Sequence, residues 1–164
     1  MEKLLVTLMR HAKSSWQVSN QSDHDRPLNQ RGIKDAPAMA QRLLEKNCCP
    51  DLILCSSAQR AMQTSTYLVE AFDLDSSQIK IKAELYLASP ESILQILHDE
   101  RGTAKHIMII AHNPGLEQLS SLLAPESSAH MPTSGIRHFS LAASGSGTAA
   151  ELIFEDYPKK AVSS

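Results

Sequence analysis

The sequence predicts an α/β protein with a mostly parallel central sheet and helices on both faces, a three-layer α/β/α architecture. Three observations lead to this prediction. Short runs rich in Leu, Ile and Val alternate with longer segments whose apolar residues recur at helical spacing. Polar, turn-forming residues separate these segments, and the sequence has no internal repeat. The 164 residues are enough for one domain with a sizeable core.

The first strand and the first helix have the clearest patterns. Residues 4–9, LLVTLM, indicate a buried strand, and a polar loop follows them. Residues 29–46 indicate a helix with Asn29 as its N-cap. Pro37 should kink this helix or restart it. The residues expected on its apolar face are Ile33, Ala36, Ala40, Leu43 and Leu44.

The later elements continue the alternation of strand and helix. Ser56 and Ser57 could cap the second helix, and the ASGSGT turn should join the two last strands. In chain order we expect a strand at 51–55, a helix to Ala71, a strand at 78–85, a helix at 90–100, a strand at 106–111, a helix at 114–124, and strands at about 136–142 and 149–154. A single domain should then span residues 1–156, with 157–164 as a flexible tail.

Composition excludes several classes of function. A net charge of −2 gives no general attraction to nucleic acid or to an anionic membrane. No apolar run approaches the roughly 18 residues of a membrane span, and the N-terminus does not resemble a signal peptide. The three cysteines, Cys48, Cys49 and Cys55, form no CxxC pair, so neither a disulfide framework nor a zinc site is expected. We therefore expect a cytoplasmic protein that binds neither nucleic acid nor membrane.

Reactive side chains follow three of the expected strands. The first strand leads into Arg10 and His11, the second into a helix whose first turn holds Arg60, and the fourth into His112. In a parallel sheet these strands end at one edge, where the N-termini of two helices also point. We therefore expect the four side chains to form one site.

Two arginines, two histidines and helix N-termini suit a tetrahedral dianion such as phosphate. The sequence lacks a GxxxxGK[ST] loop and an HExxH motif, and no aspartate follows the first strand. Metal-assisted phosphoryl transfer therefore lacks ligands, and the arginines can supply the positive charge instead. With no Ser or Cys evidently mounted as a nucleophile, a neutral histidine takes that role.

Five segments carry a family resemblance over nearly the whole chain: LMRHAKSSW, DHDRPLNQRG, CSSAQRAMQT, ELYLASPESI and AHNPG. They resemble the histidine phosphatase superfamily, and the short architecture is similar to that of SixA-type phosphohistidine phosphatases. The resemblance implies the phosphoglycerate mutase-like fold and no cofactor. It also implies His11 as the phosphorylated nucleophile, with Arg10, Arg60 and His112 as phosphate ligands. Ala12 stands where the family has glycine.

The resemblance assigns two further residues, and each has an alternative. Arg26 would be an additional arginine of the phosphate pocket, or it could pair with Asp23 or Asp25 on a solvated loop. Glu84 would protonate the leaving group, or it could be an ordinary salt-bridge partner. We expect Trp16 to pack at the pocket rim rather than act as a stacking platform. The histidines expected to be structural or exposed are His24, His98, His106, His130 and His138.

These observations favour a phosphatase without cofactor or metal that acts on protein phosphohistidine, with a histidine phosphotransfer domain as a candidate partner. Short connections between elements leave no room for a large lid, which suits a phosphorylated side chain on a folded partner. Alternatives are a phosphatase of small phosphate esters and a non-catalytic module that binds phosphate or phosphopeptides. A mutase is less favoured because it needs an enclosed site.

Overall fold

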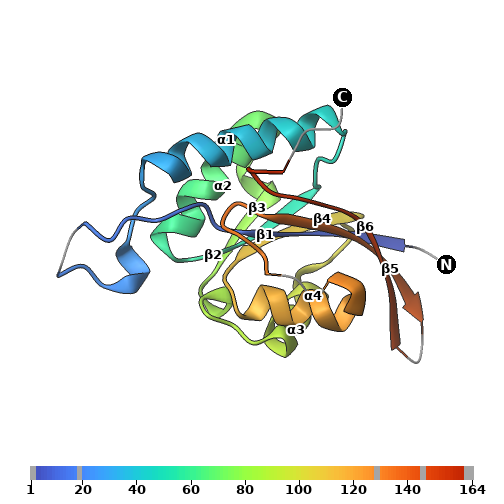
Figure 1. Ribbon diagram of the computed structural model, residues 1–164. Coiled ribbons are helices and arrows are strands. Elements are labelled where there is room, and N and C mark those ends of the chain that lie inside the picture. Colours follow the sequence, from blue (N-terminus) through green and yellow to red (C-terminus); the bar gives the residue numbers. More distant parts are fainter. Residues whose placement is uncertain (1–2, 18–19, 128–129, 145–146, 161–164) are drawn as a thin grey trace.

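The computed structural model describes residues 3–17, 20–127, 130–144 and 147–160. Within them, a six-stranded sheet lies between two layers of helices (Figure 1). The predicted three-layer α/β/α architecture is confirmed.

The sheet places the ends of its central strands at one edge. Its order is β3-β2-β4-β1-β5-β6. The first four strands are parallel to one another, whereas β5 is antiparallel to β1 and β6 is antiparallel to β5. The bounds are β1 Lys3–Arg10, β2 Leu52–Ser56, β3 Ile79–Lys82, β4 His106–Ala111, β5 Ile136–Ser144 and β6 Gly147–Asp156.

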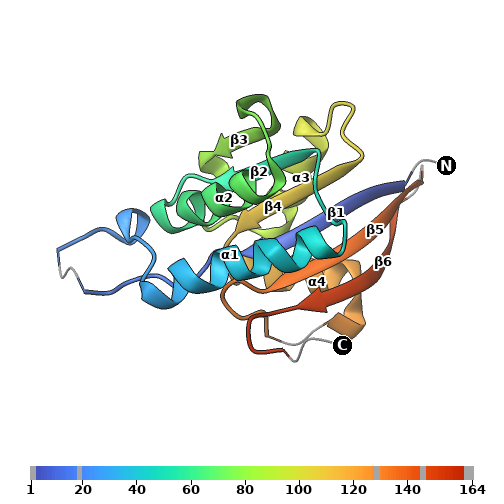
Figure 2. The same cartoon turned by 90° about the horizontal axis from the view of Figure 1, so that it is seen from above.

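Two helices cover each face of the sheet. Helices α1 and α2 lie on one face and α3 and α4 on the other, as the two perpendicular views show (Figures 1 and 2). Each face has its own apolar cluster, so both sides of the central strands are buried. The bounds are α1 Gln30–Glu45, α2 Gln59–Phe72, α3 Pro90–Glu100 and α4 Gly115–Leu123.

Three local expectations were wrong. Helix α1 does not restart at Pro37, because burial of its inner face against the sheet offsets the missing hydrogen bond, and a kink at Pro37 stays a prediction. Ile33 and Leu44 are exposed, so that inner face is narrower than predicted. Helix α2 begins after Ala58, which makes no side-chain cap, so neither Ser56 nor Ser57 is the N-cap residue.

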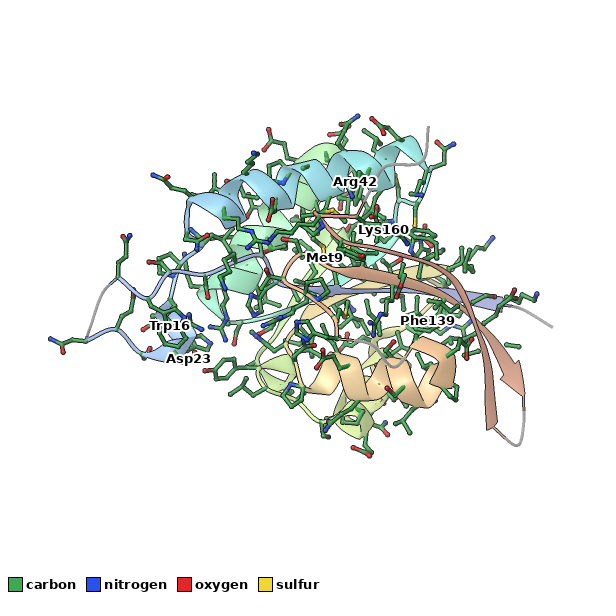
Figure 3. The ribbon with its side chains drawn as sticks, in the orientation of Figure 1. Met9, Trp16, Asp23, Arg42, Phe139 and Lys160 are labelled. Atoms are coloured by element: carbon green, nitrogen blue, oxygen red, sulfur yellow. The ribbon has the colours of Figure 1, made fainter. Side chains whose placement is uncertain are left out.

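The connection between β1 and α1 is anchored at both ends. The Asn29 amide donates to the Lys13 carbonyl over 3.0 Å, and the Asn29 side chain caps α1 through the Gly32 amide. A Cβ at Gly32 would lie 2.2 Å from the Lys13 carbonyl oxygen, so only glycine allows this approach. Trp16 and Asp23 lie on this connection, beyond the sheet edge (Figure 3).

The segment after β6 contacts α1. Arg42 donates to the carboxylate of Asp156 and to the carbonyls of Tyr157 and Pro158, over 2.9 to 3.0 Å. The expected tail therefore begins with backbone bound to α1, and residues 161–164 lie outside the described residues. The domain boundary at residue 156 stays a prediction. No helix among the described residues is long and apolar enough to cross a membrane.

Candidate active site

The structure brings four of the predicted residues together at the carboxyl edge of the sheet. Arg10 ends β1 and His11 follows it, Arg60 is in the first turn of α2, and His112 follows β4. Arg60 Nε lies 3.3 Å from His11 Nε2, and Arg60 Nη2 lies 3.4 Å from His112 Nδ1. The two imidazole rings have centroids 5.0 Å apart. The edge position follows from the parallel order β2-β4-β1.

His11 is held in one tautomer. Its Nδ1 lies 2.8 Å from the Ala12 carbonyl, which can only accept, so Nδ1 carries the proton. Nε2 is then left with its lone pair toward Arg60. Burial, together with the nearby cations, lowers the pKa of His11 to about 3, so the ring is neutral at physiological pH. A neutral imidazole with a directed lone pair can act as a nucleophile.

Ala12 fits the position where the family has glycine. It is fully buried and does not have a positive φ, so no left-handed backbone is required there. Its amide donates to Thr64 Oγ1 over 2.9 Å. The backbone that fixes the His11 tautomer is thus itself tied to α2.

His112 is bound from both sides. Its Nε2 lies 2.7 Å from Ser56 Oγ at the end of β2, and its Nδ1 faces Arg60. Burial, with the adjacent Arg60 charge, lowers its pKa to about 3. Both histidines of the site are therefore neutral at physiological pH.

Unpaired polar atoms gather around these residues. Within the described part of the chain, three buried side-chain atoms have no hydrogen-bond partner: Arg10 Nε, Asn113 Oδ1 and Ser134 Oγ. Asn113 follows His112, and the Ser134 amide donates to the carbonyls of Arg10 and His11 over 3.1 Å. Since buried donors are rarely left unpaired, Arg10 Nε and the Ser134 hydroxyl are candidates to bind oxygens of a ligand.

Asp23 is a central residue of the site that the sequence analysis considered only as a partner for Arg26. It accepts hydrogen bonds from Arg26, from Arg60 Nη2 at 3.1 Å and from the Tyr86 hydroxyl. The Tyr86 hydrogen bond, with those from the two arginines, lowers the pKa of Asp23 to about 2. Its carboxylate therefore stays ionised and neutralises charge on the two arginines. The sequence alone does not reveal this role, because Arg60 lies far from Asp23 along the chain and meets it only through the fold of the loop.

Arg26 combines features of both alternatives. It pairs with Asp23, through Nε at 3.1 Å and Nη2 at 2.9 Å, and it also donates to Ser14 Oγ. The Arg26 side chain is buried, and the Asp23 carboxylate bridges it to Arg60. Arg26 is therefore not a solvent-exposed loop residue. Trp16 differs from the expectation: it is 74% exposed and stacks on the Arg26 guanidinium at 3.4 Å, so it is a stacking partner rather than a packed residue.

Glu84 is not brought into this group of side chains. It lies in the short 3-10 helix Ala83–Leu85, and its carboxylate is 3.8 Å from Lys82 Nζ. The side chain is 66% exposed. This placement matches the salt-bridge alternative, and the role of Glu84 as an acid stays a prediction.

The other histidines divide into three kinds. His98 and His130 have exposed side chains, as expected. His24 lies at the rim, where its Nε2 is 2.9 Å from Ser57 Oγ and its ring meets the edge of Tyr86. His106 and His138 are buried together on the sheet, remote from the site.

The family model for the histidine phosphatase superfamily, branch 1, matches residues 6–86. This segment carries His11, Arg10, Arg26, Arg60 and Glu84. The chain belongs to the histidine phosphatase superfamily.

Several proteins and solved structures are similar to this member of the superfamily. An uncharacterised protein of Mycobacterium tuberculosis is 31% identical over 78% of this chain and 84% of its own length. The crystal structure of a candidate phosphohistidine phosphatase SixA from Agrobacterium tumefaciens is 28% identical, with a TM-score of 0.81, 94% of this chain and 99% of that chain covered. The protein histidine phosphatase SixA complexed with tungstate shares the fold, at 23% identity and a TM-score of 0.79 over 94% of this chain and 97% of that chain.

A mutase relative matches only part of the chain. The 2,3-bisphosphoglycerate-dependent phosphoglycerate mutase of Bifidobacterium longum is 34% identical over 42% of this chain and 28% of its own length. Family membership and these likenesses support phosphatase activity. These likenesses do not identify the substrate, which must be inferred from the geometry of the site.

Proposed function

We propose that the protein is a metal-independent phosphatase that hydrolyses phosphohistidine on a protein, through a phosphorylated His11. The observation that carries the proposal is the fixed tautomer of His11, whose Nε2 lone pair faces Arg60 beside a second neutral histidine. A nucleophile, cationic donors and a second imidazole are the parts that phosphoryl transfer needs.

The first step forms a phosphorus–nitrogen bond on the enzyme. His11 Nε2 attacks phosphorus in line, and the bond from phosphorus to the substrate imidazole breaks. The leaving nitrogen takes that electron pair and gains a proton from solvent. Arg10, Arg60 and His112 bind the non-bridging oxygens, and Arg26 adds charge if it exchanges Asp23 for phosphate.

The second step releases phosphate. Water attacks the phosphorus of phosphorylated His11, the bond to Nε2 breaks, and inorganic phosphate leaves. His11 regains its lone pair, and the Ala12 carbonyl keeps its proton on Nδ1. No metal ion is needed in either step because arginines provide the positive charge.

The choice of substrate rests on the leaving group and on access. The leaving oxygen of an ester needs a proton from a nearby acid. Neither carboxyl group fits that role, because Asp23 is ionised and Glu84 pairs with Lys82 away from His11 and the arginines. An imidazole leaving group needs that proton far less. The loop bearing Asp23 and Trp16 leaves Trp16 exposed, which suits contact with a folded partner. A phosphatase of small esters is the second candidate.

A substrate panel in EDTA tests this proposal. We expect kcat/KM for a phosphohistidine-bearing phosphotransfer domain to exceed that for the best small ester by roughly 100-fold or more, since an acid is worth 10²–10⁴-fold to an ester. EDTA should leave the rate unchanged. Higher kcat/KM for a small ester, or a requirement for added Mg²⁺, would contradict it. The His11→Gln variant is the control for contaminating phosphatases.

A further inference from the structure

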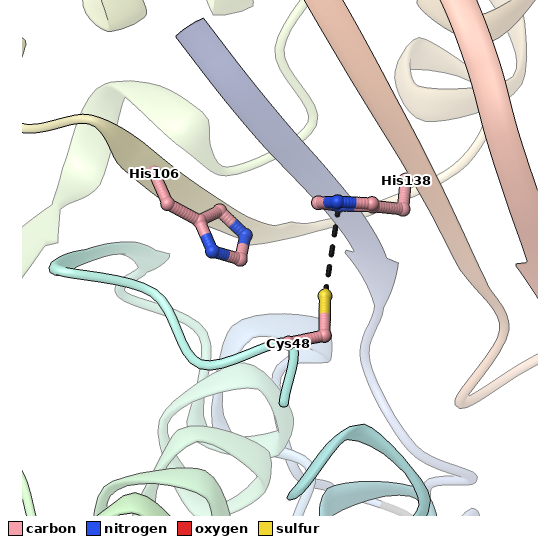
Figure 4. A group of neighbouring side chains, drawn as sticks. All are labelled: Cys48, His106 and His138. Atoms are coloured by element: carbon pink, nitrogen blue, oxygen red, sulfur yellow. Dashed lines mark hydrogen bonds between the residues drawn. The ribbon is translucent and has the colours of Figure 1, made fainter. Parts of the chain in front are cut away.

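A second cluster of polar side chains lies on the face of the sheet that α1 and α2 cover. Cys48 follows α1, His106 begins β4, and His138 is in β5. Each is at most 7% exposed. Figure 4 shows the two imidazoles and the thiol turned toward one space between them. His106 is six residues before His112, and His138 pairs with Thr7, which is four residues before His11, so the cluster is roughly 13–20 Å from the candidate active site.

The geometry of this cluster matches a metal site. One ligand atom from each residue lies within 4.8 Å of the others, and Cys48 Sγ is 3.7 Å from His138 Nδ1. With Zn–S near 2.3 Å and Zn–N near 2.0 Å, tetrahedral ligands should be roughly 3.5 Å apart. Binding all three to one ion would therefore require the longest of these separations to shorten by up to about 1.3 Å.

Thr7 lies at the centre of the cluster. Its hydroxyl is 2.6 Å from His106 Nε2 and 2.8 Å from His138 Nδ1, and it pairs in register with His138 across β1 and β5. A hydroxyl has one proton, so it can donate to only one of these nitrogens. An ion between the two imidazoles would replace these hydrogen bonds, and the Thr7 oxygen or a water would then be its fourth ligand.

The surroundings also suit a ligand set. The Asp51 carboxylate accepts hydrogen bonds from the backbone amides of Lys105 and His106, over 2.7 and 3.0 Å, and so fixes the start of β4. A hollow of about 350 Å³ is bordered by all three ligands and gives an ion a path from solvent.

We propose that Cys48, His106 and His138 bind one Zn²⁺, or a divalent transition-metal ion of similar softness, at a structural site separate from the phosphate pocket. A thiolate with two imidazoles selects such ions over Mg²⁺ or Ca²⁺. On binding, the Cys48 thiol loses its proton to solvent and the sulfur–metal bond forms. The ion would join the loop after α1 to β4 and β5. Local spacing in the sequence hides this site because its ligands come from three distant segments.

Cobalt titration of the full-length, EDTA-treated protein tests this proposal. We expect one equivalent of Co²⁺ to give a sulfur-to-cobalt charge-transfer band and tetrahedral d–d bands, both removed by Zn²⁺. Cys48→Ser should abolish the charge-transfer band and weaken affinity by roughly 100-fold or more, while His138→Gln should weaken affinity without removing the thiolate. The matched control is Cys49→Ser, which changes the adjacent exposed cysteine and should leave the spectrum intact.

A second measurement covers variants that fold poorly. At a free Zn²⁺ concentration of about 100 times Kd, the melting temperature of the parent protein should rise by roughly 5–10 °C, with no change in phosphatase rate. His11→Gln should keep this rise because the pocket is separate. Absence of a charge-transfer band in the parent protein, its survival in Cys48→Ser, or its loss in His11→Gln would each overturn the proposal.

Discussion

The Asp23 carboxylate occupies donors that a phosphoryl group would also use. It accepts from Arg60 Nη2 and from two nitrogens of Arg26, and its pKa of about 2 keeps it ionised. In the proposed mechanism it therefore holds the arginines in place before the phosphoryl group binds and competes with that group afterwards. These two effects oppose each other, and they can be separated by removing the charge while keeping the shape.

Asp23→Asn should bind vanadate more tightly than the parent by roughly 3- to 10-fold, because one negative charge near a bound dianion is removed. Asp25→Asn is the matched control, since Asp25 contacts His24 rather than an arginine. Isothermal titration with vanadate at constant ionic strength measures both. Weaker binding by Asp23→Asn would mean that positioning of Arg26 and Arg60 outweighs competition.

Glu84 distinguishes the two classes of substrate. If it is the general acid, Glu84→Gln should slow small-ester hydrolysis by 10²–10⁴-fold and leave phosphohistidine hydrolysis within about tenfold of the parent. Because Glu84 is exposed and paired with Lys82, we expect instead that Glu84→Gln hydrolyses both substrates at the rates of the parent protein. Steady-state kinetics on both substrates decide this, and equal losses on both would show that Glu84 shapes the pocket.

Most of the features that could be predicted from the sequence are the positions of strands and helices. Buried apolar runs predict β1, β2 and β4, and parallel pairing then places His11, Arg60 and His112 at one edge. Asp23 could not be placed in this way, because the loop that brings it to Arg60 has no periodic pattern. Continuation of α1 through Pro37 was equally hidden, since it depends on burial against the sheet rather than on local preference.

The start of α4 is packed too closely to accept a larger residue. A Cβ on Gly115 would lie 2.1 Å from the Ala88 carbonyl oxygen, and backbone cannot retreat as a side-chain tip can. Gly115→Ala should therefore lower the melting temperature by roughly 3–10 °C and reduce turnover, because His112 is three residues away. Leu122→Ala, at an exposed position of the same helix, is the control. An unchanged melting temperature for Gly115→Ala would contradict this packing.

His11 and His112 make the stability of the whole protein depend on pH. Their pKa values are about 3 in the folded protein, below the ordinary value of 6.5. The unfolded chain therefore binds more protons below pH 6.5, and stability is lost as pH falls from 6.5 toward 3. Each histidine should cost about 2 kcal/mol between pH 7 and pH 5.

Urea unfolding at pH 7 and pH 5 in EDTA measures this loss. Substituting both His11 and His112 by Asn should remove much of the pH dependence of the free energy of unfolding. A double variant that loses as much stability on acidification as the parent would show that other groups are responsible.

The fold brings reactive side chains from separate segments of the chain together at two places on one sheet. The site at the carboxyl edge was predictable because each of its four main residues ends a strand, follows one or lies in the first turn of a helix. The Cys48, His106 and His138 cluster was not, because its members are expected core or surface residues until β4 and β5 are placed on either side of β1.

Rapid quench of a single turnover tests the central claim most directly. Enzyme mixed with a substrate labelled in its phosphoryl group should become labelled transiently, with the label stable to alkali and lost in acid, as expected for phosphohistidine. Mass spectrometry should place it on His11, and it should form and decay fast enough to account for kcat. A label on any other residue, or full turnover by His11→Gln, would contradict the account.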